Sequence, residues 1–413
     1  MQAKYEGDPS MIYRLSVLCL LFAAPAWSNS EVETLRSEVS QLKELVMMLE
    51  QRLQAVEGQR IEVEDLHALA KANPVSVKSD NNAKVSLTSD FRLRYESIDK
   101  QGADRRERER LRARATLTYK GDDFTGVLGL ASGGDSPTST NQTFGSGGST
   151  KDLQLDLAYV IYPLSETVNI TAGKMKNPLY RPGKFGLVWD SDYRPEGVFV
   201  GYEDSGLALT AGGFWLESDT KNANERAVYA VQGRYQTSLD STKLTLGAGY
   251  FEANIAGDSP FYSGDTIKLG NLQDCLGAGC VYANDYHVIE AFAEVALAND
   301  ISAFAHWIEN SKADSNNQGY VLGVNYGRKK QAGDWAAQLA YQSLENEATM
   351  ALLTDSDFAG GGTGGEGAQI TLSYQVSKAF AVNLLYADTE RTTYTDAQPL
   401  DYERLVLDFS MKY

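Results

Sequence analysis

Five arginines stand at alternate positions in two neighbouring segments of this 413-residue chain: Arg92, Arg94, Arg110, Arg112 and Arg114. Every second side chain of an extended strand points to the same side, so each segment presents its arginines as a row. Guanidinium groups hydrogen-bond to carboxylates and phosphates, and a row of them can attract anions or form ion pairs. Because unpaired charges are costly to bury, we predict that these side chains face water or carboxylates.

The segments that carry the arginines have the period of β-strands. In KVSLTSDFRLRYE (84–96) and RLRARATLTYK (110–120), apolar or aromatic residues occupy most of the positions between the polar ones. The last ten residues, RLVLDFSMKY (404–413), alternate in the same way. Such alternation indicates a sheet with one apolar and one polar face. The apolar face needs a cover, and lipid is one candidate.

Composition restricts the class of protein. The chain is 43% apolar and 23% charged, which fits neither a disordered chain nor a helical membrane protein. Outside the N-terminus, no apolar run approaches the roughly 18 to 20 residues that a spanning helix requires. The formal net charge of -17 argues against a nucleic-acid partner, because phosphates must be neutralised by basic surface. None of these observations excludes a membrane crossed by strands.

The alternating pattern repeats from residue 84 to the end of the chain. Candidate strands begin near residues 84, 108, 123, 153, 167, 197, 205, 226, 242, 285, 301, 318, 333, 366, 379 and 401. Every second connection is short, as in KGDD and PLSE, whereas several of the others are long. An even strand count, short periplasmic turns and long outer loops are typical of bacterial outer-membrane barrels.

We therefore predict an all-β fold in which residues 84–413 form an antiparallel transmembrane β-barrel of about 16 strands. The order of short and long connections places both ends of the barrel in the periplasm. Outer-membrane lipid and lipopolysaccharide would cover the apolar face, and the last strand would pair with the first, so that no edge remains.

The N-terminal part has a different pattern. Residues 1–28 are expected to be a secretory signal peptide, because Arg14 precedes an apolar run too short to span a membrane. Residues 29–70 contain four unbroken heptads, which predict a short α-helical coiled coil in the periplasm. The a and d positions of the expected oligomer interface are Val32, Leu35, Val39, Leu42, Val46, Leu49, Leu53 and Val56. An amphipathic helix packed on its own domain is the alternative. Residues 71–83 would form a linker.

Two cysteines, Cys275 and Cys280, lie close together in the segment DCLGAGC. In an oxidising compartment such a pair favours a disulfide that staples a loop. A metal or redox pair is the alternative, but no third and fourth ligand lies nearby in the sequence. We therefore predict a disulfide at this position, and no metal or cofactor for the protein.

Two stretches resemble parts of known outer-membrane proteins. The terminal aromatic residue, with apolar residues at every second position before it, resembles the assembly signal of Gram-negative outer-membrane proteins. This resemblance implies that the barrel-insertion machinery recognises Phe409 and Tyr413. The stretch AGKMKNPLYRPGKFGLVWDSDYRPEGVFVGY (172–202) resembles the corresponding part of the putative porin family with an N-terminal coiled coil, which is akin to the general porins.

The second resemblance implies a third outward loop, near 176–197, that folds into the barrel, and it implies a homotrimer. It also implies that Asp190, Asp192 and Glu196 face the arginine row. Charges on opposite sides of a pore create a transverse field that orients solutes and sets ion preference. Alternatively, the arginines form solvated ion pairs with loop carboxylates. Because the arginines favour anions and the acidic loop favours cations, the selectivity stays open.

A barrel of this size is wide enough to enclose an aqueous channel. We therefore expect a Gram-negative outer-membrane porin for passive diffusion of ions and small hydrophilic solutes. A structural barrel that tethers the envelope through its coiled coil, with a peptidoglycan contact, is a second hypothesis. An outer-membrane enzyme is less favoured, because catalytic partners cannot be assigned to any of the three histidines, His67, His287 and His306.

Overall fold

The computed structural model describes residues 84–413 except 222–223, 263–268, 277–278, 298 and 397. The signal peptide, coiled coil and linker predicted for residues 1–83 lie outside the described residues. Within the described part of the chain, no helix is both long and apolar enough to cross a membrane. The described residues belong to the compact unit that extends from Asp80 to Tyr413.

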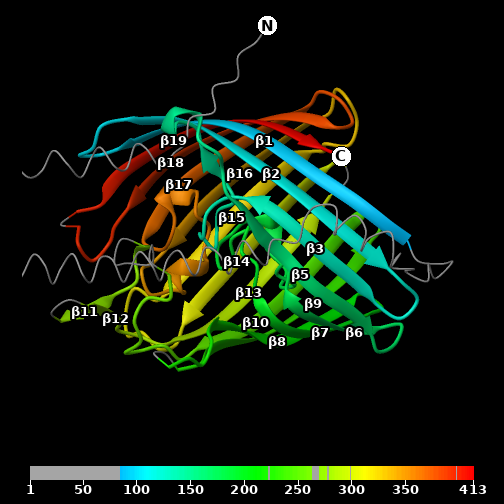
Figure 1. Ribbon diagram of the computed structural model, residues 1–413, viewed down its shortest axis with the longest axis horizontal. Coiled ribbons are helices and arrows are strands. Elements are labelled where there is room, and N and C mark those ends of the chain that lie inside the picture. The colour runs from blue at the N-terminus through cyan, green and yellow to red at the C-terminus, as the bar shows by residue number, and fades with distance from the viewer. Residues whose placement is uncertain (1–83, 222–223, 263–268, 277–278, 298, 397) are drawn as a thin grey trace, which may run out of the picture. The chain divides into compact units, whose positions relative to one another are not determined.

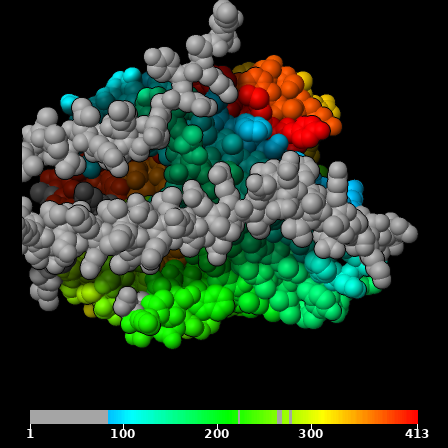
Figure 2. Space-filling view, in the orientation of Figure 1, coloured from blue at the N-terminus to red at the C-terminus, as the bar shows by residue number. Residues whose placement is uncertain are grey.

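Sixteen strands form one antiparallel sheet that closes on itself (Figure 1). They are β1 (Lys84–Lys100), β2 (Arg106–Lys120), β3 (Thr125–Ser132), β5 (Leu153–Pro163), β6 (Val168–Lys174), β7 (Glu196–Asp204), β8 (Leu207–Glu217), β9 (Arg226–Leu239), β10 (Thr242–Ala253), β13 (Tyr286–Ala296), β14 (Ile301–Asn310), β15 (Gln318–Gly327), β16 (Trp335–Leu344), β17 (Gly365–Gln375), β18 (Phe380–Arg391) and β19 (Leu400–Lys412). Each strand pairs with the next one in this order, and β19 pairs with β1. Figure 2 shows the red end of the chain beside the blue first strand. Pairing of the last strand with the first removes the free edges of an open sheet.

The predicted all-β barrel of 16 strands is confirmed. Every predicted starting point lies within two residues of an observed strand. The two faces differ as the alternation requires, as β15 illustrates. Leu322 and Val324 expose 53% and 49% of their surface on the outer face, whereas Val321, which directly precedes Leu322, is fully buried inside. Tyr320 and Tyr326 flank the two apolar residues on the outer face, as expected at the boundaries of a lipid layer.

Smaller elements lie in the long connections between the barrel strands. Loop 2 (133–152) contains β4 (Gln142–Thr143) and the 3-10 helix η2 (Ser146–Gly148), and loop 3 (175–195) contains η3 (Pro182–Lys184). Loop 7 (345–364) contains η5 (Ala351–Leu353) and η6 (Phe358–Gly360). The connection from 254 to 285 contains the hairpin of β11 (Gln273–Leu276) and β12 (Gly279–Tyr282). We call the opposite end of the barrel, with turns such as 121–124 and 205–206, the short-turn end.

The largest apolar cluster lies inside the barrel, where loops 3 and 7 pack against inward-facing side chains. Trp189 of loop 3 is 2% exposed. Its ring lies 5.0 Å from that of Phe251 in β10 and 6.0 Å from that of Phe214 in β8, measured between centroids. Leu353 of loop 7 belongs to the same cluster. Burial of this apolar surface holds loop 3 against the inner wall of the barrel.

Loop 3 starts early because β6 has only seven residues. Gly173, the penultimate residue of β6, has a φ of +121°. A Cβ atom at this position would lie 2.2 Å from the carbonyl oxygen of Ala158 in β5. Glycine therefore permits both the backbone conformation and the close approach of the two strands. The chain leaves the wall directly afterwards.

Candidate functional site

Strand pairing brings the five predicted arginines together on the inner face of β1 and β2. The register sets Arg92 opposite Arg112, and Arg94 opposite Arg110. Arg114 follows two residues after Arg112, so it lies on the same face. Like charges directly opposite each other are destabilising. Carboxylates from the same strands, from other strands and from two loops offset this repulsion, and the contacts form two separate groups.

The first ion-pair group joins β1 and β2 to loop 3. Its members are Asp90, Arg112, Arg114, Asp156, Asp192 and Arg194. The guanidinium group of Arg114 lies 2.8 Å from Asp90 and 2.9 Å from Asp192. Arg194 of loop 3 lies 3.3 Å from Asp156 of β5. Three arginines therefore meet three carboxylates, and the group has no net formal charge.

The second ion-pair group joins β1, β2 and β19 to loop 7. Its members are Arg92, Arg94, Glu96, Arg108, Arg110, Asp357, Arg404 and Asp408. Asp357 of loop 7 lies 2.9 Å from both Arg94 and Arg404. Five arginines face three carboxylates in this group. It therefore has an excess of two positive charges.

Arg92 and Arg110 are the least completely paired arginines of the second group. Their nearest carboxylate oxygens, on Asp408 and Glu96, lie at 3.7 and 3.8 Å. The Nε atoms of both arginines are buried without a hydrogen-bond partner among the described residues. A side-chain nitrogen of Arg92 donates instead to the Oδ1 atom of Asn141 in loop 2, at 2.6 Å. The excess positive charge of the group lies at these two side chains.

Of the three carboxylates expected to face the arginine row, only Asp192 contacts it. Asp190 accepts hydrogen bonds from the backbone N–H groups of Asp192 and Ser356, at 2.6 and 2.8 Å, so it joins loop 3 to loop 7. Glu196 is the first residue of β7 and pairs with Lys174 at 2.7 Å. Loop hydrogen bonds thus direct the side chain of Asp190 to loop 7, and the position at the start of β7 directs that of Glu196 to Lys174.

The contact of Asp192 is direct, since its carboxylate lies within ion-pair distance of Arg112 and Arg114. No open gap separates these charges. Asp192 is therefore in ion-pair contact with the arginine row.

The carboxyl groups of loops 3 and 7 differ in their proton affinity. Burial, followed by the charge of Asp355, raises the pKa of Asp190 well above its ordinary value. Burial and then the charge of Asp357 raise the pKa of Asp355. Burial raises the pKa of Asp357 too, but Arg404 and Arg94 outweigh this effect and hold it below its ordinary value. Loop 7 therefore contacts loop 3 beside two carboxyl groups with a raised pKa, Asp190 and Asp355. It contacts the barrel wall through Asp357, whose pKa is lowered.

Several members of the two groups were not predicted as site residues. Arg404 and Asp408 lie in the alternating segment 404–413, on its polar face, so the strand period was a signal for them. Glu96 shares the polar face of its strand with Arg94 in the same way. Asp357 had no such signal, because loop 7 has no regular period.

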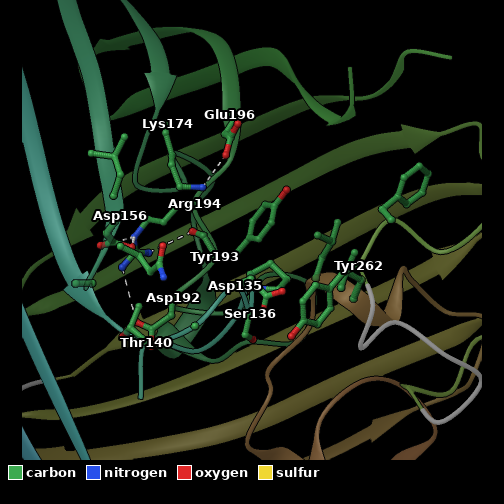
Figure 3. Close-up of a pocket in the computed structure, with 18 of the residues that line it drawn as sticks. Asp135, Ser136, Thr140, Asp156, Lys174, Asp192, Tyr193, Arg194, Glu196 and Tyr262 are labelled. Carbon is green, nitrogen blue, oxygen red and sulfur yellow. Dashed lines mark hydrogen bonds and ion pairs between the residues drawn. The ribbon is translucent and has the colours of Figure 1, made fainter. Parts of the chain in front are cut away.

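Two cavities border loop 3. One of about 350 Å³ lies among residues of loops 2, 3 and 7, β5 and β8. Figure 3 shows that the Lys174–Glu196 pair stands apart from Asp156, Asp192 and Arg194 in this cavity. The second, of about 500 Å³, lies between residues 177–184 and the inner side of β6 to β9.

The other predicted residues lie away from the two groups. Cys275 and Cys280 are joined by a disulfide in the β11–β12 hairpin. Phe409 is 37% exposed, and Tyr413, at 90%, is almost fully exposed. The backbone N–H of Tyr413 donates to the carbonyl of Ser89 at 2.9 Å, which ties the end of the chain to β1. The predicted coiled-coil positions lie outside the described residues.

A family model described as putative porin matches residues 50–263 and 280–413. Among solved structures, Pseudomonas putida OprB is 12% identical with a TM-score of 0.52, over 80% of this chain and 94% of that one. Salmonella typhi OmpF is 12% identical with a TM-score of 0.49, over 81% and 99%. A Rhodopseudomonas blastica porin mutant is 12% identical with a TM-score of 0.46, over 80% and 100%. No curated protein matches the sequence. The likeness to OprB, at this identity, shows the fold alone.

Proposed function

The chain belongs to the putative porin family, and from this premise we propose that it forms a water-filled channel in the outer membrane of a Gram-negative bacterium. Ions and small hydrophilic solutes would diffuse through it passively. A closed barrel of 16 strands is wide enough for an aqueous lumen. Its inner face carries two groups of ion pairs, which suits a wall in contact with water and solutes.

The proposed constriction lies where loop 3 meets the arginine row. The observation that carries this proposal is the ion pair between Asp192 and Arg114, at 2.9 Å. Loop 7 adds a second link through Asp357 and Arg94. Both loops reduce the free cross-section on the inner side of the barrel. Fixed charges at a narrow point act on passing ions with little screening, so they set the ion preference.

The reversal potential of the purified protein in a planar bilayer under a KCl gradient tests this proposal. Asp192→Asn removes one negative charge beside Arg112 and Arg114, so the preference should move toward anions. Asp99→Asn is the matched control, because Asp99 belongs to an exposed ion pair with Arg105. Wild-type protein without stepwise conductance would exclude the channel. Equal shifts in both variants would exclude a constriction at Asp192.

A gap in strand pairing supports assembly as a homotrimer. The pairing of β5 with β6 runs only from Ala158 to Pro163, so the first part of β5, from Leu153 to Leu157, pairs with β3 alone. The Lys174–Glu196 pair borders this gap, and its two side chains are 31% and 62% exposed. Unpaired backbone groups and charges cannot face lipid without a large energetic cost. Further copies of the chain are the cover that we propose.

Charge reversal tests this interface. Glu196→Arg would place two like charges at the gap and should weaken the trimer seen by native mass spectrometry in mild detergent. Asp258→Asn, which changes an ion pair with Arg226 elsewhere, is the control. A trimer of unchanged stability in Glu196→Arg would place the interface on another part of the barrel.

The proposal also includes the predictions for the N-terminal part of the chain and for insertion of the barrel into the membrane. Residues 1–28 would be removed after export, and the coiled coil of residues 29–70 would hang in the periplasm. Phe409 and Tyr413 would be recognised by the insertion machinery. A tether to peptidoglycan through the coiled coil is compatible with a channel, and protease access in intact and permeabilised cells would locate this segment.

A further inference from the structure

The cavity of about 500 Å³ beside loop 3 has the character of a binding site. It lies toward the short-turn end of the barrel, where Glu203 and Ala208 of its wall flank the turn at 205–206. Its volume falls in the range of about 300 to 1,000 Å³ that is typical of sites for small molecules. No residue of the two ion-pair groups lines it. It is therefore separate from the arginine row.

Positive charge dominates the lining of this cavity. Arg181 and Lys184 come from loop 3, and Arg234 comes from β9. Neither Arg181 nor Lys184 has an ion pair within the described part of the chain. The only carboxylate of the lining is Glu203, which lies 3.3 Å from Arg234 and is 73% exposed. Arg181 donates to the carbonyl of Trp189 within loop 3 at 3.5 Å. Lys184 and Arg234 against one exposed carboxylate still leave a net positive charge at the cavity.

An unused hydrogen-bond donor also lines the cavity. The Oδ1 atom of Asn177 accepts a hydrogen bond from the backbone N–H of Leu179 at 3.0 Å, which fixes the amide. The Nδ2 atom of the same side chain is buried and has no hydrogen-bond partner among the described residues. A buried donor without a partner costs roughly 1 to 3 kcal/mol, so a ligand oxygen at this position would be favourable.

Loop 3 is held rigidly where it lines the cavity. The backbone N–H of Tyr180 donates to Gln232 of β9 at 2.7 Å, and the amide of Gln232 donates back to the carbonyl of Tyr180 at 3.0 Å. The Tyr180 hydroxyl donates to Glu294 of β13 at 2.8 Å. The guanidinium carbon of Arg234 lies 5.4 Å from the centre of the Tyr180 ring. These contacts place the cationic groups before a ligand arrives.

We propose that this cavity binds a small organic anion, with its carboxylate or phosphate group at Lys184 and Arg234 and an oxygen at the Nδ2 atom of Asn177. Leu179 and Phe199 supply apolar surface for the carbon skeleton of the ligand. The inference rests on the proposed channel, since the site would load anions within the lumen. The inference also predicts that the channel prefers anions, because the second ion-pair group likewise has excess positive charge.

Isothermal titration calorimetry of the full-length protein in detergent tests the site. The probes are succinate and glycerol 3-phosphate, with glycerol as the uncharged comparison. Lys184→Gln and Arg234→Gln should each weaken the binding of the anions about tenfold, which corresponds to about 1.4 kcal/mol. Arg226→Gln is the matched control, because Arg226 lies on the same strand and pairs with Asp258 outside the cavity. It should change the affinity less than twofold.

The inference is supported if the wild type binds either anion and the two cavity variants lose this binding. The anion that binds more tightly then identifies carboxylate or phosphate as the ligand group. Equal weakening in Arg226→Gln would indicate general attraction of anions by the lumen and would overturn the site, as would absent anion binding in the wild type. Circular dichroism and heat-dependent mobility on gels verify that each variant is folded. Conductance in KCl without anion binding refutes only the site, and anion binding without conductance refutes only the channel.

Discussion

The guanidinium group of Arg94 and the carboxylate of Asp408 lie 2.7 Å apart, although 314 residues separate them in the sequence. Arg94 is on the first strand of the barrel and Asp408 is on the last. A second hydrogen bond of 2.9 Å joins the same two groups, so the contact is bidentate. Both side chains are largely buried, at 6% and 12% exposure. The pair therefore joins the two strands whose contact closes the barrel.

Loss of this pair should destabilise the barrel. Removing one partner of a buried ion pair costs about 3 to 5 kcal/mol, because the remaining charge is left uncompensated. Arg94 keeps its contact with Asp357, so we expect Asp408→Ala to cost about 3 kcal/mol. Urea unfolding of the barrel in lipid vesicles measures the change. Asp99→Ala breaks the exposed pair with Arg105 and should have little effect. Similar losses of unfolding free energy in both variants would contradict a special role of the Arg94–Asp408 pair in closing the barrel.

Trp189→Ala should release loop 3 from the inner wall. The side chain is almost fully buried against Phe214 and Phe251, and loss of such an aromatic group costs about 3 to 5 kcal/mol. Because the lost contacts hold one loop rather than the sheet, we expect larger current fluctuations and higher mean conductance in single-channel records. Trp335→Ala is the control, since Trp335 is 61% exposed on the outer face. Unchanged currents in Trp189→Ala would show that loop 3 is held by its ion pairs instead.

The contact between loops 3 and 7 should depend on pH. The pKa of Asp190 is raised in the docked loops, first by burial and then by the charge of Asp355. A group with a raised pKa binds its proton more tightly in the docked state, so docking is strongest at low pH and weakens as the pH rises through this pKa. Current fluctuations should therefore increase as the pH rises above about 4, the ordinary pKa of an aspartate.

Asp355→Asn is the variant that checks this pH dependence. It removes the neighbouring charge but keeps the Oδ1 atom, which accepts hydrogen bonds from Asp357 and Phe358. The increase with pH should become smaller in this variant, and an equal increase would exclude the proposed cause. The contact of loop 7 with the barrel wall should depend on pH in the opposite direction, because the pKa of Asp357 is lowered. Hydrogen exchange should show that this link persists in moderate acid.

Deletion of residues 31–57 should weaken the oligomer without abolishing conductance. The heptads of this segment predict a parallel helical assembly, whereas the barrel closes through its own strands. Native gels and planar bilayers measure the two properties separately. An unchanged trimer after the deletion would assign the segment to tethering rather than to assembly.

The sequence by itself determined the barrel and the row of arginines. Apolar and polar residues alternate with a period of two, and this pattern indicates which side chains face lipid and which face the lumen. The contrast is a local property of each strand. The starts of all 16 strands followed from it, as did the shared face of Arg92, Arg94, Arg110, Arg112 and Arg114. The alternation of short and long connections then indicated which loops lie at the same end.

Only the tertiary structure decided which charges meet. Asp190 and Asp192 are two residues apart in loop 3, yet one binds loop 7 and the other binds the arginine row. Asp357 reaches Arg94 from a loop without any period. Ion pairs require side chains within about 4 Å of each other, and in loops the backbone directions that bring them together come from packing against distant segments. A local sequence pattern contains no information about that packing.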